Sequence, residues 1–315
     1  MKNEELSRRN VARFETVLSG VLGELDSPKC LEVITLGTPA VPGAYDVLTS
    51  RSVLLAAADK VGVQLHMAEL TRLSRVGTYA IFDFKRMDLG GGFTPRWIRD
   101  AMRGLGWVPA AQSDDEETGV TVAAFHRPFP DSVYFVTSNP MKLREMRSAV
   151  AHAHLHACDF DIPELKHDSI EKIADDKARR AYAIVRRPVL CTDGGIFMDA
   201  YDGFPGPNSK QAATKLKPEG LLRLLVGVQN RNGSRRNAAA FFDGYQMSVE
   251  VSEVPVRFSE EPRGTHPSYP MDKILIPVTE ANVAGLTYAE MPPEERGRTS
   301  EVPALAAFVR SVAVR

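Results

Sequence analysis

Cysteine is scarce in this chain. Its 315 residues include three, Cys30, Cys158 and Cys191, and none has the CxxC spacing that is typical of zinc sites and redox motifs. A small, odd number of widely spaced cysteines excludes a disulfide scaffold and fits the reducing cytoplasm. We expect these residues to act as small apolar side chains in the core.

Long apolar runs and an excess of charge of one sign are also missing. No uninterrupted apolar run approaches the about 18 residues of a membrane-spanning helix, and the start, with Lys2, Glu4 and Arg8, lacks a signal-peptide core. The formal net charge is −1, which gives no overall attraction to nucleic acid or to an anionic membrane. We therefore expect a cytoplasmic protein with no nucleic-acid or membrane partner, in which any polyanion site is a local patch.

The length and composition indicate a globular protein of about two domains. The chain is 43% hydrophobic and 25% charged, which is enough to bury a substantial core. An acidic turn at Ser113–Gly119, a strand-like run at Val120–Phe125 and a proline-bearing connector suggest a boundary at Pro130. The expected domains are therefore residues 1–130 and 131–315.

Residues 1–130 show alternating helix and strand patterns. Residues Asn3–Leu22 have amphipathic helical spacing, with Val11, Phe14, Val17, Leu18 and Leu22 on one face. Thr94 followed by Pro95 is typical of a helix start. The predicted order is helix 3–22, strand 31–36, helix 50–61, strand 79–84 and helix 94–105. This order indicates a small α/β domain.

Two glycine-bearing loops in this domain are candidate ligand loops. Leu89–Trp97 places three glycines before a helix start, and Arg96, Arg99 and Arg103 follow at helical spacing. Gly37–Asp46 follows a predicted strand, a usual position for ligand loops in open α/β sheets. The first loop matches neither the Walker A nor the dinucleotide spacing, so a plain loop beside a solvated basic helix is the alternative.

Residues Val133–Met146 form the most informative stretch. A strand-like apolar run stops at a small polar turn, which contains Thr137 and Asn139, and the chain restarts as a helix that bears Lys142. Backbone N–H groups and the positive end of the helix favour an anion, to which Lys142 adds a point charge. The pattern predicts a phosphate site, although the same pattern also occurs in α/β proteins for structural reasons alone.

Six further motifs follow in a specific order. They are Asp161–Leu165, Pro188–Ile196, Gly203–Pro207, Leu216–Leu221, Pro262–Gly264 and Thr287–Pro292. Together with Val133–Met146 they resemble the inosine triphosphate pyrophosphatase family, the non-canonical purine NTP pyrophosphatases, over Asp131–Arg315. The resemblance implies a mixed α/β fold, in which an elongated twisted sheet forms two lobes with a nucleotide cleft between them. It also implies a homodimer, because family enzymes commonly dimerise.

The local patterns of this second domain agree with a mixed α/β fold. The predicted elements are strand 133–136, helix 140–150, strand 152–160, helix 170–185, strand 189–192, helix 219–226, strands 238–242 and 246–258, and helix 302–314.

Hydrolysis of a phosphoanhydride needs cations on the phosphates, a divalent metal on hard oxygen ligands, and a group that activates water. The resemblance places Lys142 on the phosphates and makes Asp193, after a buried-looking strand, the catalytic aspartate and a ligand of Mg²⁺. An N-cap is the alternative role of Asp193. Counting back from Pro188 places a second acidic ligand at Lys172 or, with one residue of slack, at Glu171. We choose Glu171.

The remaining candidate residues are expected to bind substrate, some through the resemblance and some through their position in the chain. Lys177 projects from the helix before Asp193, and Tyr269 and Asp272 match the segment that stacks on and reads the base. The set predicted to bind substrate is Thr137, Asn139, Lys177, Phe204, Gly206, Lys210, Tyr269 and Asp272.

Two departures from the family pattern affect the metal and the base. Thr192 stands where the family has a second acid beside the catalytic aspartate, and Ser300-Glu301-Val302 stands where it has Ser-His-Arg. His and Arg donate to a purine oxo group, whereas Glu301 accepts, so a base with an amino group would fit better, or no base is read. We therefore expect a nucleotide-processing hydrolase that converts a nucleoside triphosphate to monophosphate and pyrophosphate with altered base specificity. The alternative is a non-hydrolytic nucleotide-binding or dimer-scaffold domain that serves residues 1–130.

Overall fold

The chain forms two compact units in a computed structural model. The residues described are 2–23, 25–34, 38–51, 54, 59–86, 93–137, 139, 142–143, 146, 154–160, 162–265, 269–298 and 302–313. The first unit comprises residues 1–134, 156–161 and 184–187, and the second comprises residues 135–155, 162–183 and 188–315. The expected boundary between independently folding domains at Pro130 stays a prediction.

The first unit contains a five-stranded mixed sheet. Its strands are β1 (Cys30–Glu32), β2 (Val47–Ser50), β3 (Tyr79–Lys85), β4 (Val108–Asp114) and β5 (Val120–His126), in the order β1-β2-β3-β5-β4. The first three strands run parallel, and β5 is antiparallel to both of its neighbours.

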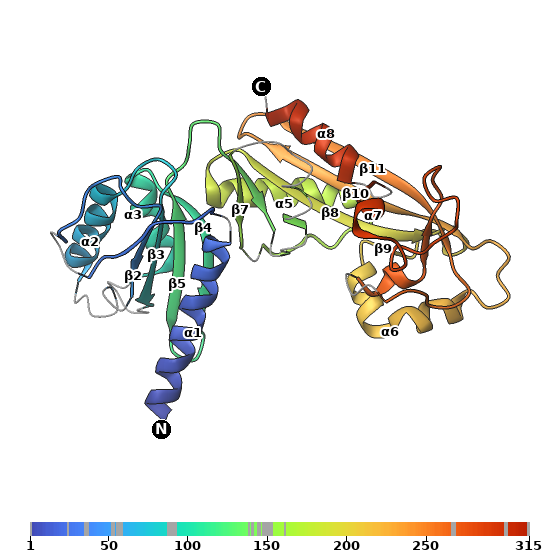
Figure 1. Cartoon of the computed structure of the whole chain (residues 1–315), viewed down its shortest axis with the longest axis horizontal. Helices are drawn as coiled ribbons and strands as arrows, with labels where there is room; N and C mark the ends of the chain where they lie inside the picture. The colour runs from blue at the N-terminus through green and yellow to red at the C-terminus, as the bar shows by residue number, and fades with distance from the viewer. Residues whose placement is uncertain are drawn as a thin grey trace. The chain divides into compact units, whose positions relative to one another are not determined.

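Helices cover both faces of this sheet (Figure 1). Helix α1 (Lys2–Leu22) packs Phe14 and Val17 against Ile81 on one face. Helices α2 (Lys60–Leu73) and α3 (Pro95–Gly104) pack on the other face, against Phe82. Because side chains alternate along β3, neighbouring residues serve the two cores. The predicted apolar face of α1 is confirmed in part, since Val11 is exposed and Val21 is buried.

The predicted helix at 50–61 is wrong at Ser50, Arg51, Leu54 and Asp59, which are not helical, and residues 52–53 and 55–58 lie outside the described residues. Val47–Ser50 is a strand whose Val47 and Leu48 are fully buried, and α2 begins only at Lys60. The Asp59 side chain caps α2 by accepting from the Gly62 N–H at 2.8 Å. The predicted strand at 31–36 is shorter, and β4 was not predicted. By contrast, α3 starts as expected, with the Thr94 hydroxyl accepting from the Trp97 N–H at 3.1 Å.

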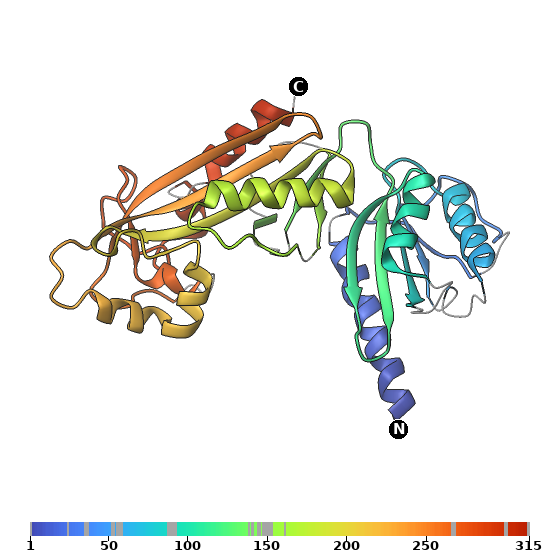
Figure 2. The same ribbon diagram turned by 180° about the vertical axis from the view of Figure 1, so that it is seen from behind.

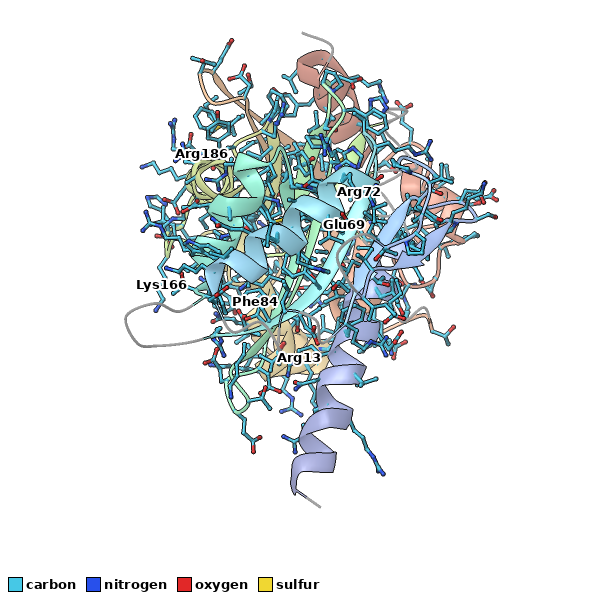
Figure 3. The ribbon with its side chains drawn as sticks, turned by 90° about the vertical axis from the view of Figure 1, so that its left-hand side faces the viewer. Arg13, Glu69, Arg72, Phe84, Lys166 and Arg186 are labelled. Atoms are coloured by element: carbon cyan, nitrogen blue, oxygen red, sulfur yellow. The ribbon has the colours of Figure 1, made fainter. Side chains whose placement is uncertain are left out.

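Buried polar side chains of the first unit tie α2 to its surroundings. Ser50 Oγ lies 2.6 Å from His66 Nε2, and both residues are buried. Glu69 accepts from Arg72 Nε at 2.9 Å and from Nη2 at 2.8 Å, so the two side chains lie together on α2 (Figure 3). These contacts explain the buried charge of Glu69 as a structural ion pair.

The second unit is built on a seven-stranded sheet. The strand order is β12 (Leu275–Pro277), β11 (Met247–Phe258), β10 (Asn232–Phe242), β8 (Val189–Met198), β6 (Val133–Val136) and β7 (Leu155–Cys158), and β9 (Pro205–Gly206) pairs with β8. The helical elements are α5 (Ile170–Val185), η1 (Asp199–Tyr201), α6 (Ser209–Leu224), η2 (Pro270–Lys273), α7 (Pro293–Arg298) and α8 (Val302–Ala313). Helix α8 lies in front of β10 and β11 in Figure 1, whereas α5 lies in front of the sheet in Figure 2, so the two helices cover opposite faces. The expected mixed α/β class is therefore confirmed.

Three predicted elements of this unit have the wrong bounds, and one of them is β10, which starts at Asn232 instead of Ala238. Strand β8 continues to Met198 instead of ending at Thr192, because Gly194 and Gly195 pair with Asn237 and Arg236 of β10. Helix α6 starts at Ser209 instead of Glu219 and is kinked at Lys217. Helix α5 has the predicted bounds. Most of the predicted helix 140–150 and the start of the predicted strand 152–160 lie outside the described residues.

Among the residues that the structure describes, no helix has both the length and the apolar character that crossing a membrane requires.

Candidate functional site

Asp193 lies inside β8 rather than at the end of a strand. It pairs with Ala238 of β10 at one edge of β8. At the other edge β9 pairs only with Ile196 and Phe197, and β6 also lies on this side of β8. Asp193 therefore precedes the point at which β9 joins the sheet.

The carboxylate of Asp193 is partly desolvated and incompletely hydrogen-bonded. Its Oδ2 atom is buried, and no donor from the described residues forms a hydrogen bond with it. Burial raises the pKa of this carboxyl to about 6, against the opposing influence of Lys142 and Lys177. A buried acceptor without a donor is costly unless a ligand completes its shell. This atom is the strongest sign of a ligand site in the described part of the second unit.

Two predicted lysines lie close enough to Asp193 to act on its charge. Lys142 Nζ donates to Thr192 Oγ1 at 3.3 Å, next to Asp193 in the chain. Lys177 projects from α5 and forms a 3.0 Å ion pair with Glu164. The structure thus places the charges of Lys142 and Lys177 within electrostatic reach of Asp193, and the roles of all three residues stay predictions.

Glu164 is a further acid at this site that was not selected from the sequence. Its negative charge raises the pKa of Asp193, which places its carboxylate within electrostatic reach. Its side chain is 60% exposed, whereas that of its partner Lys177 is 18% exposed. The available signal was the motif Asp161–Leu165, in which Glu164 directly follows a proline.

Glu171 has different neighbours. Its Oε2 accepts from Ser169 Oγ at 2.6 Å, and this hydrogen bond together with the charge of Arg236 lowers its pKa. Neither contact involves Asp193, so the two predicted metal ligands have separate described partners. The role of Glu171 as a ligand stays a prediction.

The loop that the resemblance places along the substrate is fixed against β8. A Cβ atom on Gly195 would collide with the carbonyl oxygen of Gly206. Ser209 Oγ donates to Gly206 O at 2.5 Å and accepts from Ile196 N at 2.7 Å. Phe204 and Lys210 flank this tether with exposed side chains. Ser209 is therefore a positioning residue, and no local sequence pattern marks it as one.

The polar turn after β6 has only part of its residues described. The Asn139 N–H donates to Thr137 Oγ1 at 3.1 Å, which is a local turn contact of the kind that exposes neighbouring backbone N–H groups. Binding of phosphate by Thr137 and Asn139 stays a prediction.

Tyr269 and Asp272 lie together at η2. The Asp272 N–H donates to Tyr269 O at 3.0 Å, and the Asp272 carboxylate lies 3.5 Å from Arg235 Nη1. Burial raises the pKa of Tyr269 to about 12, and the positive charge of Arg235 opposes that shift. Arg235, on β10, was not selected from the sequence.

The donor set fits Mg²⁺. This ion commonly uses one or two protein carboxylates, waters and substrate phosphates rather than an all-protein cage. Within the described residues no group of three or more His, Cys, Asp or Glu is placed to hold a metal. Asp193, with its buried unpartnered oxygen, and Glu164 would supply the one or two carboxylates that such a shared site needs.

The order of motifs agrees with a known family. Residues 133–309, more than half of the chain, match the profile of the Ham1 family. The chain belongs to the Ham1 family. Its relatives include a dITP/XTP pyrophosphatase of Methanopyrus kandleri, which is 34% identical over 171 residues, or 53% of this chain and 88% of that protein. Inosine triphosphate pyrophosphatase 2 of Trypanosoma cruzi is 34% identical over 174 residues, or 53% of this chain and 85% of that protein.

A solved Ham1 structure shares the fold of the second unit. A HAM1 protein from Coxiella burnetii superposes with a TM-score of 0.50 at 20% identity, covering 57% of this chain and 99% of that chain. The resemblance to the inosine triphosphate pyrophosphatase family is therefore confirmed by the Ham1 match and by these relatives.

Proposed function

We propose that the second unit hydrolyses a nucleoside triphosphate to the monophosphate and pyrophosphate with Mg²⁺. The observation that carries this proposal is the buried Oδ2 of Asp193, which has no donor among the described residues, in a carboxyl whose pKa responds to two lysines and a second acid. Cations for phosphate and carboxylates for a hard metal are the groups that phosphoanhydride hydrolysis needs. The names of the Methanopyrus and Trypanosoma relatives support the same reaction class.

Each residue has a distinct task in this mechanism. Lys142, Lys177 and Lys210 neutralise phosphate oxygens, while Asp193 and Glu164 would hold the metal and position water. Mg²⁺, when bound, supplies Lewis-acid polarisation of the phosphate and lowers the pKa of bound water. A base stacks on Tyr269, and the Ser209 tether keeps Phe204 and Gly206 in place beside β8.

We further propose that base discrimination is weak. Ser300-Glu301-Val302 lacks the His and Arg donors that the family presents to a purine oxo group. Large discrimination comes from buried polar groups that are left unpaired by the wrong substrate. The preference for inosine over adenosine triphosphate, measured as the ratio of kcat/KM, should therefore stay below about 100-fold. A larger ratio would show that other residues rebuilt the lost contacts.

Thr192 is the second departure to test. A carboxylate holds a hard cation more strongly than a neutral hydroxyl does, so Thr192→Glu should tighten Mg²⁺ binding or raise pyrophosphate release at low Mg²⁺. Isothermal titration of Mg²⁺ in the presence of a non-hydrolysable triphosphate measures the first effect, and Thr192→Gln controls for side-chain size. Weaker binding in the Glu variant than in the Gln variant would contradict the idea.

The hydrolase is distinguished from a non-hydrolytic domain by a single screen. The full-length protein is incubated with nucleoside di- and triphosphates, with and without Mg²⁺, and both phosphate and pyrophosphate are quantified. Mg²⁺-dependent pyrophosphate release supports the proposal, whereas binding without release supports the non-hydrolytic alternative. Analytical ultracentrifugation of the same sample tests the expected homodimer.

A further inference from the structure

Arg235 occupies a defined place beside the predicted base-binding segment. It lies on β10, opposite Ile196 of β8 and Val254 of β11. Its Nη1 atom is 3.5 Å from Asp272 Oδ1, and its Cζ atom is 5.1 Å from the centroid of the Tyr288 ring. The side chain of Arg235 is 25% exposed, whereas that of Asp272 is 4% exposed. The guanidinium therefore lies between a buried acid and the surface.

The elements around Arg235 hold it in place. Asp272 is fixed by two backbone hydrogen bonds, one from its N–H to Tyr269 O and one from the Ala289 N–H to its own carbonyl oxygen, both at 3.0 Å. Tyr288 is fully buried in the apolar core beneath. An ion pair with a buried acid and contact with an aromatic face restrict a long side chain that would otherwise be mobile.

The strand register relates Arg235 to Thr192 rather than to Asp193, which pairs with Ala238 and therefore lies at a register position of the opposite face. Thr192, the hydrogen-bond partner of Lys142, pairs with Ala239 of β10. Residues 235 and 239 point to the same face of that strand, because side chains alternate with a period of two. The four residue steps from 235 to 239 span about 13 Å, which is a suitable separation between a phosphate held by Lys142 and the base of an extended nucleotide.

A guanidinium at this position has a clear chemical preference. Its planar fork of N–H donors matches two adjacent acceptors, such as O6 and N7 of a purine with a 6-oxo group. Adenine offers N7 as an acceptor but an amino group in place of O6, so the fork meets a donor there. Tyr269, whose hydroxyl lies within the electrostatic reach of Arg235, is the expected stacking partner of the same base.

We propose that Arg235 is a specificity-determining residue whose guanidinium donates to the base of the bound nucleotide and favours 6-oxopurines. This inference rests on the proposed pyrophosphatase function of the second unit. Arg235 supplies the modest preference for inosine over adenosine triphosphate that remains when the His-Arg pair of the family is missing. Asp272 positions Arg235 in this arrangement rather than reading the base directly.

The test compares kcat/KM for inosine and adenosine triphosphates in four proteins. They are the wild type, Arg235→Ala, Arg235→Lys and the control Arg257→Ala, which removes an exposed arginine from β11 of the same hairpin. We expect an inosine preference of about 10-fold in the wild type and the control, because a bidentate base contact discriminates by about this much or more. The preference should fall to about 1 in Arg235→Ala, through a higher KM for inosine triphosphate at unchanged kcat.

Arg235→Lys and one additional double variant separate base reading from folding. Arg235→Lys keeps the charge beside Asp272 but loses the fork, so it should fold and still lose most of the preference. The double variant Arg235→Ala/Asp272→Asn removes both charges and should behave like Arg235→Ala. Equal losses for both triphosphates, or an unchanged ratio, would overturn the inference and leave the pyrophosphatase proposal intact.

If the second unit does not hydrolyse nucleotides, a binding measurement tests the role of Arg235 instead. If the wild type releases no pyrophosphate, Kd values for both triphosphates with Mg²⁺ replace the kinetic ratio, with and without Arg235→Ala. A Kd preference for inosine triphosphate that disappears in Arg235→Ala supports the inference without hydrolysis. Absence of binding, or a ratio independent of Arg235, overturns it.

Discussion

Replacing Asp193 with Asn is expected to lower kcat for Mg²⁺-dependent pyrophosphate release by about 100-fold or more. Asn keeps the shape of the side chain but removes the charge that would hold the metal or activate water. The buried Oδ2, which lacks a donor among the described residues, is the atom that this substitution alters. Pyrophosphate release at saturating substrate and Mg²⁺ measures the effect, and an unchanged kcat would remove Asp193 from the mechanism.

The thermal stability of Asp193→Asn shows whether a loss of kcat comes from the lost charge or from a damaged fold. Burial gives Asp193 a folded-state pKa of about 6, above the ordinary aspartate pKa of 3.8. A raised pKa means that the folded protein binds a proton more tightly than the unfolded chain does, so the stabilisation is complete below about pH 4 and is lost as the pH rises through about 6. Metal-free Asp193→Asn should therefore melt at the same or a higher temperature than the wild type at pH 7.5, and the difference should shrink towards pH 4. Mg²⁺ with nucleotide should raise the melting temperature of the wild type alone.

Glu164→Gln should reduce kcat/KM by about 30-fold or more, whereas Glu171→Gln should change it by less than about 3-fold. Of these two acids, it is Glu164 whose charge raises the pKa of Asp193. The described contacts of Glu171 are with Ser169 and Arg236. Titrating activity against Mg²⁺ for the two variants checks this, because loss of a ligand raises the Mg²⁺ concentration needed for half-maximal rate.

These two acids are well matched, since both are exposed and both substitutions preserve size. Glu164→Gln also breaks the 3.0 Å ion pair with Lys177, so Lys177→Met is measured beside it. A normal Mg²⁺ requirement in Lys177→Met and a raised one in Glu164→Gln would assign the effect to the metal. A larger rise in the Mg²⁺ requirement for Glu171→Gln than for Glu164→Gln would instead support Glu171, the ligand chosen by counting residues in the sequence.

Local sequence signals predicted α1, α3 and α5 better than they predicted α2, α6 and the ends of strands. Thr94 and Pro95 placed α3, and the apolar period placed α1 and α5. The extent of β8 was missed because Gly194 and Gly195 normally weaken a strand. Here they allow the close approach of Gly206 on one side and of the Arg236 carbonyl on the other. These close approaches, which require glycine at both positions, arise only once β9 and β10 have paired with β8.

The sequence by itself determined the family, through motifs whose order needs no three-dimensional information, and it identified Lys142, Lys177 and Asp193 as a group. Only the tertiary structure showed that Glu164 lies within electrostatic reach of Asp193, what fixes the loop at Gly206 and where Arg235 lies. The physical reason is distance along the chain. Arg235 meets Asp272 across 37 residues, and Glu164 acts on Asp193 across 29. Such contacts depend on strand register and side-chain packing, which no local pattern encodes.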